Sequence, residues 1–140
     1  YQDLVECLPY DEAVYMLQVN GTQLERMLRR ILREEAFEGE HTEFYQFSHG
    51  MQIIWSRGQQ KFETLTLNGK ALDQQKLYTI ALSKFHYMNI QNFLNISLEE
   101  IKINAPPRVL ATSYRDIVEE YMMMNPHLSS EVEGRLIVKT

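Results

Sequence analysis

The stretch Val132-Glu133-Gly134-Arg135-Leu136-Ile137-Val138-Lys139-Thr140 closes the chain. Its apolar residues recur with an alternating pattern, and a period of two predicts a half-buried β-strand. Gly134 permits a backbone angle or a close approach that other residues resist, so we expect a bulge or a tight entry at the start of this strand. On its own, the pattern indicates only a C-terminal strand.

The composition is typical of a globular protein. The chain has 140 residues, which fit one domain with a single core, and 44% of them are hydrophobic and 24% charged. The formal net charge of −5 argues against sequence-independent nucleic-acid binding, because such binding needs a basic face for the phosphates. No apolar stretch approaches the roughly 20 residues that a membrane span requires.

The start of the chain carries no targeting pattern. Asp3 and Glu6 stand where a secretory signal has a basic and then an apolar segment. The chain begins at Tyr1 without an initiator methionine, so we interpret residues 1–140 as one domain excised from a longer chain. No compartment is assigned from the sequence.

The first third of the chain predicts a strand followed by a helix. Residues 13–19 are apolar and β-prone, and Asn20-Gly21 is a turn signal. Thr22 and Glu25 fit a capping box, and apolar residues recur behind it at helical spacing, so a helix is predicted from Thr22 to Ala36 or Phe37. Its arginines are interpreted as a solvated face with pairs such as Glu25–Arg29, or alternatively as an anionic docking patch.

The rest of the chain mixes strands and helices. Strands are predicted at residues 51–57, at 62–67 before an Asn68-Gly69 hairpin turn, and at 77–83, which we expect to be a central strand. Residues 85–94 are ambiguous, Ser97 with Glu100 predicts a short helical turn, and Ser113 opens a helix that Asn125-Pro126 ends. An apolar stripe on one face of that helix comprises Tyr114, Ile117, Val118, Tyr121 and Met122. These elements predict an α+β fold with a mixed, largely antiparallel sheet and packed helices.

No catalytic apparatus is predicted in this chain. His41, His49, His86 and His127 lack the spacing of metal ligands, so no metal site is predicted. Gly-x-Ser-x-Gly and phosphate-loop patterns are absent from the sequence. Cys7 is interpreted as a small core residue rather than a catalytic thiol. The neighbouring acids at 34–35 and 119–120 diverge on their helices and suit a solvated surface.

Aromatic residues near predicted loops are the remaining candidates for binding. A ring at such a position either packs in the core or stacks on a flat ligand such as a nucleobase. These residues are Tyr10, Phe44, Tyr45, Phe47, Phe85, Tyr87 and Phe93.

Six short motifs, taken together and in order, resemble the C-terminal domain of the 5′-nucleotidase and UDP-sugar hydrolase family, which includes 2′,3′-cyclic-nucleotide phosphodiesterases. The segment Asp3-Leu4 with Leu8-Pro9-Tyr10-Asp11 is similar to the family's "D-L…L-P-F-(D/G)-N". The later motifs are Val19-Asn20-Gly21-Thr22-Gln23-Leu24, Thr42-Glu43-Phe44-Tyr45-Gln46-Phe47-Ser48, Leu67-Asn68-Gly69-Lys70-Ala71-Leu72-Asp73, Tyr78-Thr79-Ile80-Ala81 and the closing Val132-Glu133-Gly134-Arg135-Leu136. They extend across nearly the whole chain.

The resemblance implies a two-domain hydrolase of which this chain is the substrate-binding half. An N-terminal metallophosphoesterase domain of the same polypeptide would hold two divalent metal ions that activate water, whereas this chain would hold no cofactor. The nucleotide or nucleoside base would stack between Tyr10, where the family usually has Phe, and Phe85. Domain rotation would then bring the phosphate to the metals, so the chain alone is expected to be inactive.

The chain departs from the family pattern around this pocket. The family's Gly-Gly-Asp-Gly-Tyr/Phe segment aligns with Asn89-Ile90-Gln91-Asn92-Phe93, so Gln91 replaces the carboxylate that contacts ribose. We expect Gln91 and Asn89 to bond the sugar or base, and a loop backbone that differs because its glycines are lost. Glu12 stands near the base where relatives have Asn or Gly, and Thr42 replaces a usual Gly.

Two further interpretations are retained. In the first, the chain is a degenerate copy that serves domain closure or forms a homodimer without holding nucleotide, with residues 122–124 supplying a methionine-rich surface. In the second, it is an unrelated α+β ligand-binding domain.

Overall fold

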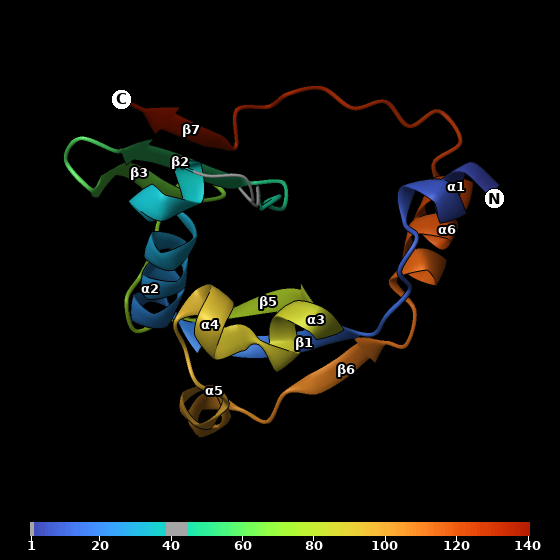
Figure 1. Ribbon diagram of the computed structural model, residues 1–140, viewed down its shortest axis with the longest axis horizontal. Helices are drawn as coiled ribbons and strands as arrows, with labels where there is room; N and C mark the ends of the chain where they lie inside the picture. Colours follow the sequence, from blue (N-terminus) through green and yellow to red (C-terminus); the bar gives the residue numbers. More distant parts are fainter. Residues whose placement is uncertain (1, 39–44) are drawn as a thin grey trace. The chain divides into compact units, whose positions relative to one another are not determined.

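The computed structural model describes residues 2–38 and 45–140 of the chain (Figure 1). Its helices and strands, in order, are α1 (Gln2–Cys7), β1 (Val14–Asn20), α2 (Gly21–Ile31), the 3-10 helix η1 (Glu34–Phe37), β2 (Met51–Ser56), β3 (Lys61–Leu67), β4 (Lys70–Ala71), β5 (Leu77–Ser83), α3 (Lys84–Met88), α4 (Ile90–Leu94), α5 (Leu98–Asn104), β6 (Arg108–Ala111), α6 (Tyr114–Met124) and β7 (Leu136–Lys139).

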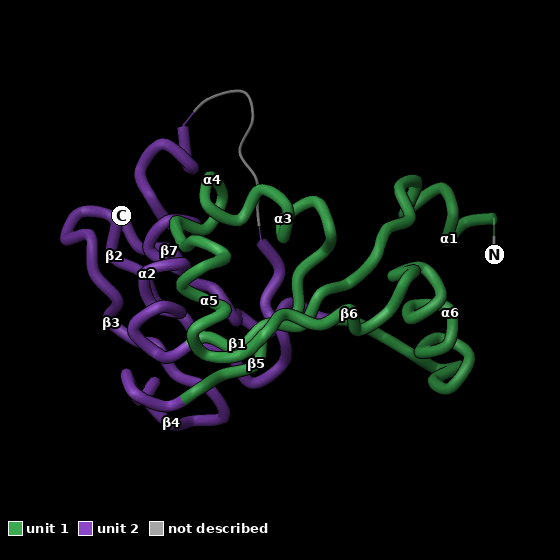
Figure 2. Tube along the Cα trace, turned by 90° about the horizontal axis from the view of Figure 1, so that it is seen from below, with its two compact units in different colours: residues 1–19, 77–130 green, residues 20–76, 131–140 purple. Residues whose placement is uncertain are grey.

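The chain divides into two compact units, coloured separately in Figure 2. Unit 1 comprises Tyr1–Val19 and Leu77–Ser130, and unit 2 comprises Asn20–Lys76 and Glu131–Thr140. The interpretation of residues 1–140 as one domain cut from a longer chain stays a prediction.

Unit 1 is built on a three-stranded sheet in the order β5-β1-β6. Strands β1 and β6 are antiparallel, with Tyr15 opposite Val109 and an irregularity between Val14 and Tyr15. The prediction that residues 77–83 form a strand is confirmed, but their central position is wrong, because β1 lies in the middle of this sheet. An apolar, β-branched run is compatible with both positions, since either kind of strand can bury one face.

Short helices follow the sheet strands of unit 1. The ambiguous residues 85–94 form α3 and α4, and Ser97 caps α5 in a capping box with Glu100, as predicted. The buried side chains of these helices and their connection are Ile90, Leu94, Ile96 and Ile101, while β1 contributes Leu17 and Val19.

Helices α1 and α6 lie side by side in unit 1 (Figure 1). The predicted limits of α6 are confirmed, with Ser113 as its N-cap and Asn125 as its C-cap. Its apolar stripe is not a core face in this structure, since α6 has no buried residue and Tyr121 is 55% exposed. Cys7, interpreted as a core residue, is also exposed, because it ends a six-residue helix that buries no side chain.

Unit 2 begins with α2, whose capping differs from the prediction. The capping box is formed by Asn20 and Gln23, each side chain bonding the other's backbone N–H at 2.9 Å, rather than by Thr22 and Glu25. The backbone N–H groups of Gly21 and Thr22 donate hydrogen bonds to the carbonyls of residues 76 and 74, respectively. The helix ends at Ile31, and the predicted last turn is replaced by η1.

A four-stranded mixed sheet in the order β4-β3-β2-β7 completes unit 2. Strands β2 and β3 pair antiparallel through the whole of β2, whereas β7 runs parallel to β2 with Leu136 opposite Ile53. The predicted hairpin at Asn68-Gly69 is confirmed, and both residues have positive φ angles of 51° and 75°. The two sheets and their helices confirm the α+β fold class.

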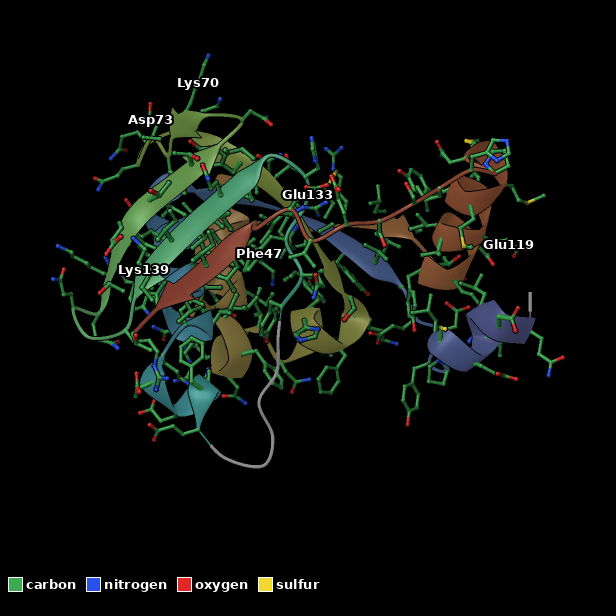
Figure 3. The ribbon with its side chains drawn as sticks, turned by 90° about the horizontal axis from the view of Figure 1, so that it is seen from above. Phe47, Lys70, Asp73, Glu119, Glu133 and Lys139 are labelled. Atoms are coloured by element: carbon green, nitrogen blue, oxygen red, sulfur yellow. The ribbon has the colours of Figure 1, made fainter. Side chains whose placement is uncertain are left out.

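The closing motif is held by an arginine clip, defined here as Arg135, Glu133, His49 and the Phe47 carbonyl. Figure 3 labels Phe47 and Glu133. Arg135 donates to the Glu133 carboxylate at 2.7 Å and to the Phe47 carbonyl at 2.6 Å. The clip joins the entry of β7 to the segment before β2, next to the parallel pairing of these strands. Gly134 has a φ of +69°, which meets the expectation of a tight entry to the strand.

We predict that Gly21→Ala destabilises the protein by about 1–3 kcal/mol, which is the usual cost of inserting a methyl group into a packed site. A Cβ at Gly21 would lie 2.1 Å from the backbone oxygen of Asp73, so the backbone itself would have to move. Urea unfolding measures the loss. Gly58→Ala is the matched control, since its Cβ would meet nothing within 4 Å, and equal effects of the two variants would contradict the prediction.

We predict that the arginine clip makes stability depend on acid pH. The hydrogen bond from Arg135, and then the contact with His49, lower the pKa of Glu133 from 4.5 to about 2. A carboxyl with a depressed folded pKa stabilises the fold above its unfolded pKa, and this contribution is lost as the pH falls from about 4.5 toward 2. Urea unfolding across this window is expected to be less pH-dependent in Glu133→Gln and in Arg135→Gln. The double variant should resemble either single one, and additive effects would show that the two residues act separately.

Candidate functional site

A cavity of about 640 Å³ lies within unit 1. Its lining residues are Leu8, Tyr10, Glu12, Ser83, Phe85, His86 and Tyr114, and it is called here the aromatic cavity. The structure therefore brings Tyr10, Glu12 and Phe85, which were predicted from distant parts of the sequence, to one place. Neither ring is taken up by the core, since Tyr10 is 82% and Phe85 50% exposed.

Residues 8–12 are held in position by the start of α6. Arg115 donates from Nη2 to the carbonyls of Leu8 at 2.8 Å and Pro9 at 3.3 Å. Asp11 accepts from the Ser113 hydroxyl at 3.0 Å and from the Arg115 backbone N–H at 3.3 Å. The Ser113 hydrogen bond is the largest cause of a lowered pKa at Asp11, so the carboxylate stays ionised and keeps these bonds at neutral pH.

Phe85 lies in the first turn of α3, directly after β5. Ser83 caps this helix by accepting from the His86 backbone N–H at 3.4 Å, and its hydroxyl lies 3.0 Å from His86 Nδ1. The rings of Phe85, His86 and Phe93 form a cluster with centroids 5.4–5.5 Å apart. The packing of these rings against one another restricts the motion of the Phe85 ring on one side of the aromatic cavity.

The other aromatic candidates have packing contacts or lie outside the cavity. Tyr87 stacks on Tyr15 with ring centroids 4.0 Å apart and therefore joins α3 to β1. Phe93 packs against Phe85. Tyr45 and Phe47 belong to unit 2, and Phe44 and Thr42 lie outside the described residues.

Glu12 connects the loop to both helices that border the cavity. Its Oε2 accepts from the Phe85 backbone N–H at 3.0 Å, and its backbone carbonyl accepts from the Tyr114 N–H at 3.0 Å. Next to it, the Ala13 carbonyl accepts from the Lys84 N–H at 2.8 Å. The helix N-termini supply N–H groups that have no partner inside their own helices, and the loop satisfies three of them.

Asn89 and Gln91 lie elsewhere. Both line a second hollow of about 310 Å³ between α4 and the start of α5, and neither lines the aromatic cavity. Asn89 Nδ2 also donates to the Phe85 carbonyl at 2.9 Å, where it satisfies the end of α3. The structure thus separates these two amides from the pair of rings, and their contact with a sugar stays a prediction.

The segment aligned with the family's glycines is helical in this chain, and a difference from the backbone of its relatives stays a prediction. Residues 90–94 form helix α4, which ends at Asn95 in the left-handed conformation with a φ of 53°. A glycine-rich segment would resist this helix, because glycine loses the most conformational freedom on ordering.

Sequence reasoning missed the residues that support the cavity, namely Leu8, Ser83, His86, Tyr114 and the Asp11–Arg115 contacts. Ser83 stands three residues before a helical N–H that it caps, as the predicted cap Ser113 also does, so its position was a usable signal. Arg115 had no such signal, since its partners are backbone carbonyls that are distant in the sequence.

The described residues contain no group of three or more His, Cys, Asp or Glu side chains arranged to hold a metal ion. None of the helices formed by the described residues is both long and apolar enough to cross a membrane.

We predict that Arg115→Met loosens the loop of residues 8–12, because it removes the charged donor to two carbonyls. The Tyr114 amide, bonded to the Glu12 carbonyl, should exchange hydrogen at least about tenfold faster, since a hydrogen bond from a charged group contributes about 1.5–3 kcal/mol. The Ile101 amide in α5 serves as the internal reference. Arg108→Met, which changes an exposed arginine of β6, is the control, and unchanged exchange at Tyr114 in Arg115→Met would rule out this support.

Comparison with known proteins identifies the scaffold. The family model described as "5'-nucleotidase, C-terminal domain" matches residues 1–98. No curated protein sequence matches the chain. Among solved structures, the chain resembles the 5′-nucleotidase precursor from Thermus thermophilus, with a TM-score of 0.72 and 16% identity over 98% of this chain and 27% of that one.

A second similar structure is a Staphylococcus aureus protein described as a 5′-nucleotidase in complex with alpha-ketoglutarate. The TM-score is 0.64 and the identity 17%, over 99% of this chain and 29% of that one. At these identities the likeness shows the fold, and the chain spans less than a third of the length of either structure. From the family match and the shared fold, the chain belongs to the family of 5′-nucleotidase C-terminal domains.

Proposed function

We propose that this chain is the nucleotide-binding domain of a metal-dependent phosphoesterase and that it stacks the base between Tyr10 and Phe85. The observation that carries the proposal is that both rings line the aromatic cavity although they come from distant parts of the sequence. A volume of about 640 Å³ falls within the usual range for small-molecule sites.

The state of the two rings supports stacking. Phe85 is braced by His86 and Phe93 yet remains half exposed, and Tyr10 is mostly exposed on a loop held by Arg115. Tyrosine in place of the family's usual phenylalanine keeps the π face that stacking requires. Each stacked base–aromatic pair contributes about 1–3 kcal/mol, so two rings are sufficient for measurable binding of a nucleotide.

The hydrolytic chemistry would belong to another part of the polypeptide. The solved 5′-nucleotidase structures are more than three times as long as this chain, which leaves room for an N-terminal metallophosphoesterase domain. Two divalent metals held there would activate the water that attacks phosphorus. This chain would bind and orient the nucleotide, and Asn89 and Gln91 would contact its sugar only if the substrate extends beyond the aromatic cavity.

The alternative is a domain that serves closure or dimerisation without binding nucleotide. The observation in its favour is the exposed methionine surface on α6, where Met123 is 76% and Met124 70% exposed. Methionine side chains adapt readily to a partner surface.

We predict that Tyr10→Leu weakens nucleotide binding by about tenfold, because it removes one stacking surface, whereas Tyr10→Phe binds as the wild type does. Calorimetric titration of the 140-residue chain with AMP, UMP, adenosine and UDP-glucose measures the effect. Tyr121→Leu is the matched control, since Tyr121 is an exposed tyrosine of the same unit that does not line the cavity. Binding that is unchanged in both Tyr10→Leu and Phe85→Leu, or absent at millimolar concentration, would favour the closure alternative.

A further inference from the structure

We propose that Glu12 reads the edge of the stacked base and selects guanine. This inference rests on the proposed function, because it assigns specificity within the same aromatic cavity. Glu12 lines that cavity beside both rings, and its carboxylate is fixed there by the hydrogen bond to the Phe85 N–H.

The carboxylate is anchored relative to the stacking ring. Phe85 supplies the ring through its side chain and the hydrogen-bond donor to Glu12 through its backbone, at 3.0 Å from Oε2. The Glu12 backbone is fixed separately by the Tyr114 N–H at 3.0 Å. A base that stacks on Phe85 therefore presents its edge to an acceptor whose position is set by the same residue.

The carboxylate has unused acceptor capacity. An ionised carboxylate offers about four lone-pair positions, and the Phe85 N–H occupies one of them. Within residues 2–38 and 45–140, Oε1 has no hydrogen-bond partner. Of the described residues that line the cavity, none is a lysine or an arginine that would neutralise the charge. A ligand is therefore favoured by the N–H donors that it directs at Glu12 and disfavoured by acceptors.

Guanine matches this requirement better than the other bases. Its N1–H and its 2-amino group are adjacent donors that can bond one carboxylate in a bidentate manner, as the two N–H groups of an arginine do. Hypoxanthine retains the N1–H and lacks the amino group. Uracil has one N–H between two carbonyl oxygens, which a carboxylate repels, and adenine and cytosine each pair one amino group with an acceptor nitrogen.

The test compares GMP with IMP, which differ only in the 2-amino group. The contributions of stacking and of the phosphate to the binding free energy therefore cancel in the ratio of the two affinities. The wild-type chain is expected to bind GMP at least about tenfold more tightly than IMP, since one hydrogen bond to a charged group accounts for that factor. UMP should bind more weakly than IMP. This comparison needs no variant and so does not depend on whether a substituted chain folds.

Glu12→Gln is the matching variant. Its amide oxygen can still accept from the Phe85 N–H, while an amide N–H₂ replaces the acceptor that faces the ligand. The GMP-to-IMP ratio is expected to fall to within about threefold, and Glu120→Gln, which neutralises an exposed carboxylate of α6, should keep the wild-type ratio. The ratio is read within each variant, so a general loss of affinity does not mimic the effect.

The outcomes separate this inference from the proposed function. Equal binding of GMP and IMP by the wild type, or an unchanged ratio in Glu12→Gln, would overturn the role of Glu12. If Tyr10→Leu still weakened both nucleotides, the stacking site would stand without base selection. The absence of any nucleotide binding would overturn both proposals.

Discussion

The hydrogen bonding of residues 12 and 13 to two helix N-termini is the constraint on which the site depends. The N–H groups of Lys84, Phe85 and Tyr114 have no partners within their own helices. All three donate hydrogen bonds to oxygen atoms of residues 12 and 13. If the loop were displaced, three N–H groups and the carboxylate of Glu12 would need other partners. The loop that carries Tyr10 is therefore held between α3 and α6, and the hydrogen bond from the Phe85 N–H to Glu12 joins it to the residue that supplies the second ring.

Local patterns in the sequence were sufficient for most elements, because their signals involve only neighbouring residues. Period-two alternation, the Asn68-Gly69 turn and the caps at Ser97 and Ser113 all belong to this kind. The capping of α2 shows the limit of such local signals. The sequence offers two overlapping capping boxes, Asn20 with Gln23 and Thr22 with Glu25, and the structure forms the first. The choice between them depends on the carbonyls of residues 74 and 76, which accept from the first turn of the helix and are distant in the sequence.

Burial was harder to predict than the elements themselves. The stripe on α6 has helical spacing, yet none of its residues is buried, and Cys7 is exposed on α1. Periodicity reports which side chains share a face, and whether that face is covered depends on what packs against it. The expectation that β5 is a central strand was wrong, because its apolar pattern does not determine which strands pair with it. The closing Val132–Leu136 motif lies beyond residues 1–98, which the family model matches, so its assignment to the family pattern stays a prediction from the sequence.

The sequence correctly grouped three of the residues that line the aromatic cavity, but it did not predict the positions of the two amide side chains. Tyr10, Glu12 and Phe85 meet because the loop and the end of β5 hold them. A motif alignment also proposed Asn89 and Gln91, but alignment transfers a residue's role only when the local backbone is similar. In this chain the segment forms α4 with Asn89 as its N-cap, and Asn89 and Gln91 line a different hollow from the aromatic cavity.

Affinity and selectivity in this cavity have different physical sources. Stacking depends on π faces that every base presents, so the two rings of the proposed site would bind bases with little preference among them. Preference requires directional groups at the base edge, and Glu12 contributes a carboxylate to the lining of the aromatic cavity. Because its carboxylate already accepts from the Phe85 N–H, Glu12 would serve both as a structural residue and as a recognition residue in the proposed site. Any change of selectivity at this position must keep an acceptor for that N–H, which is why glutamine can alter recognition while alanine would also release Phe85.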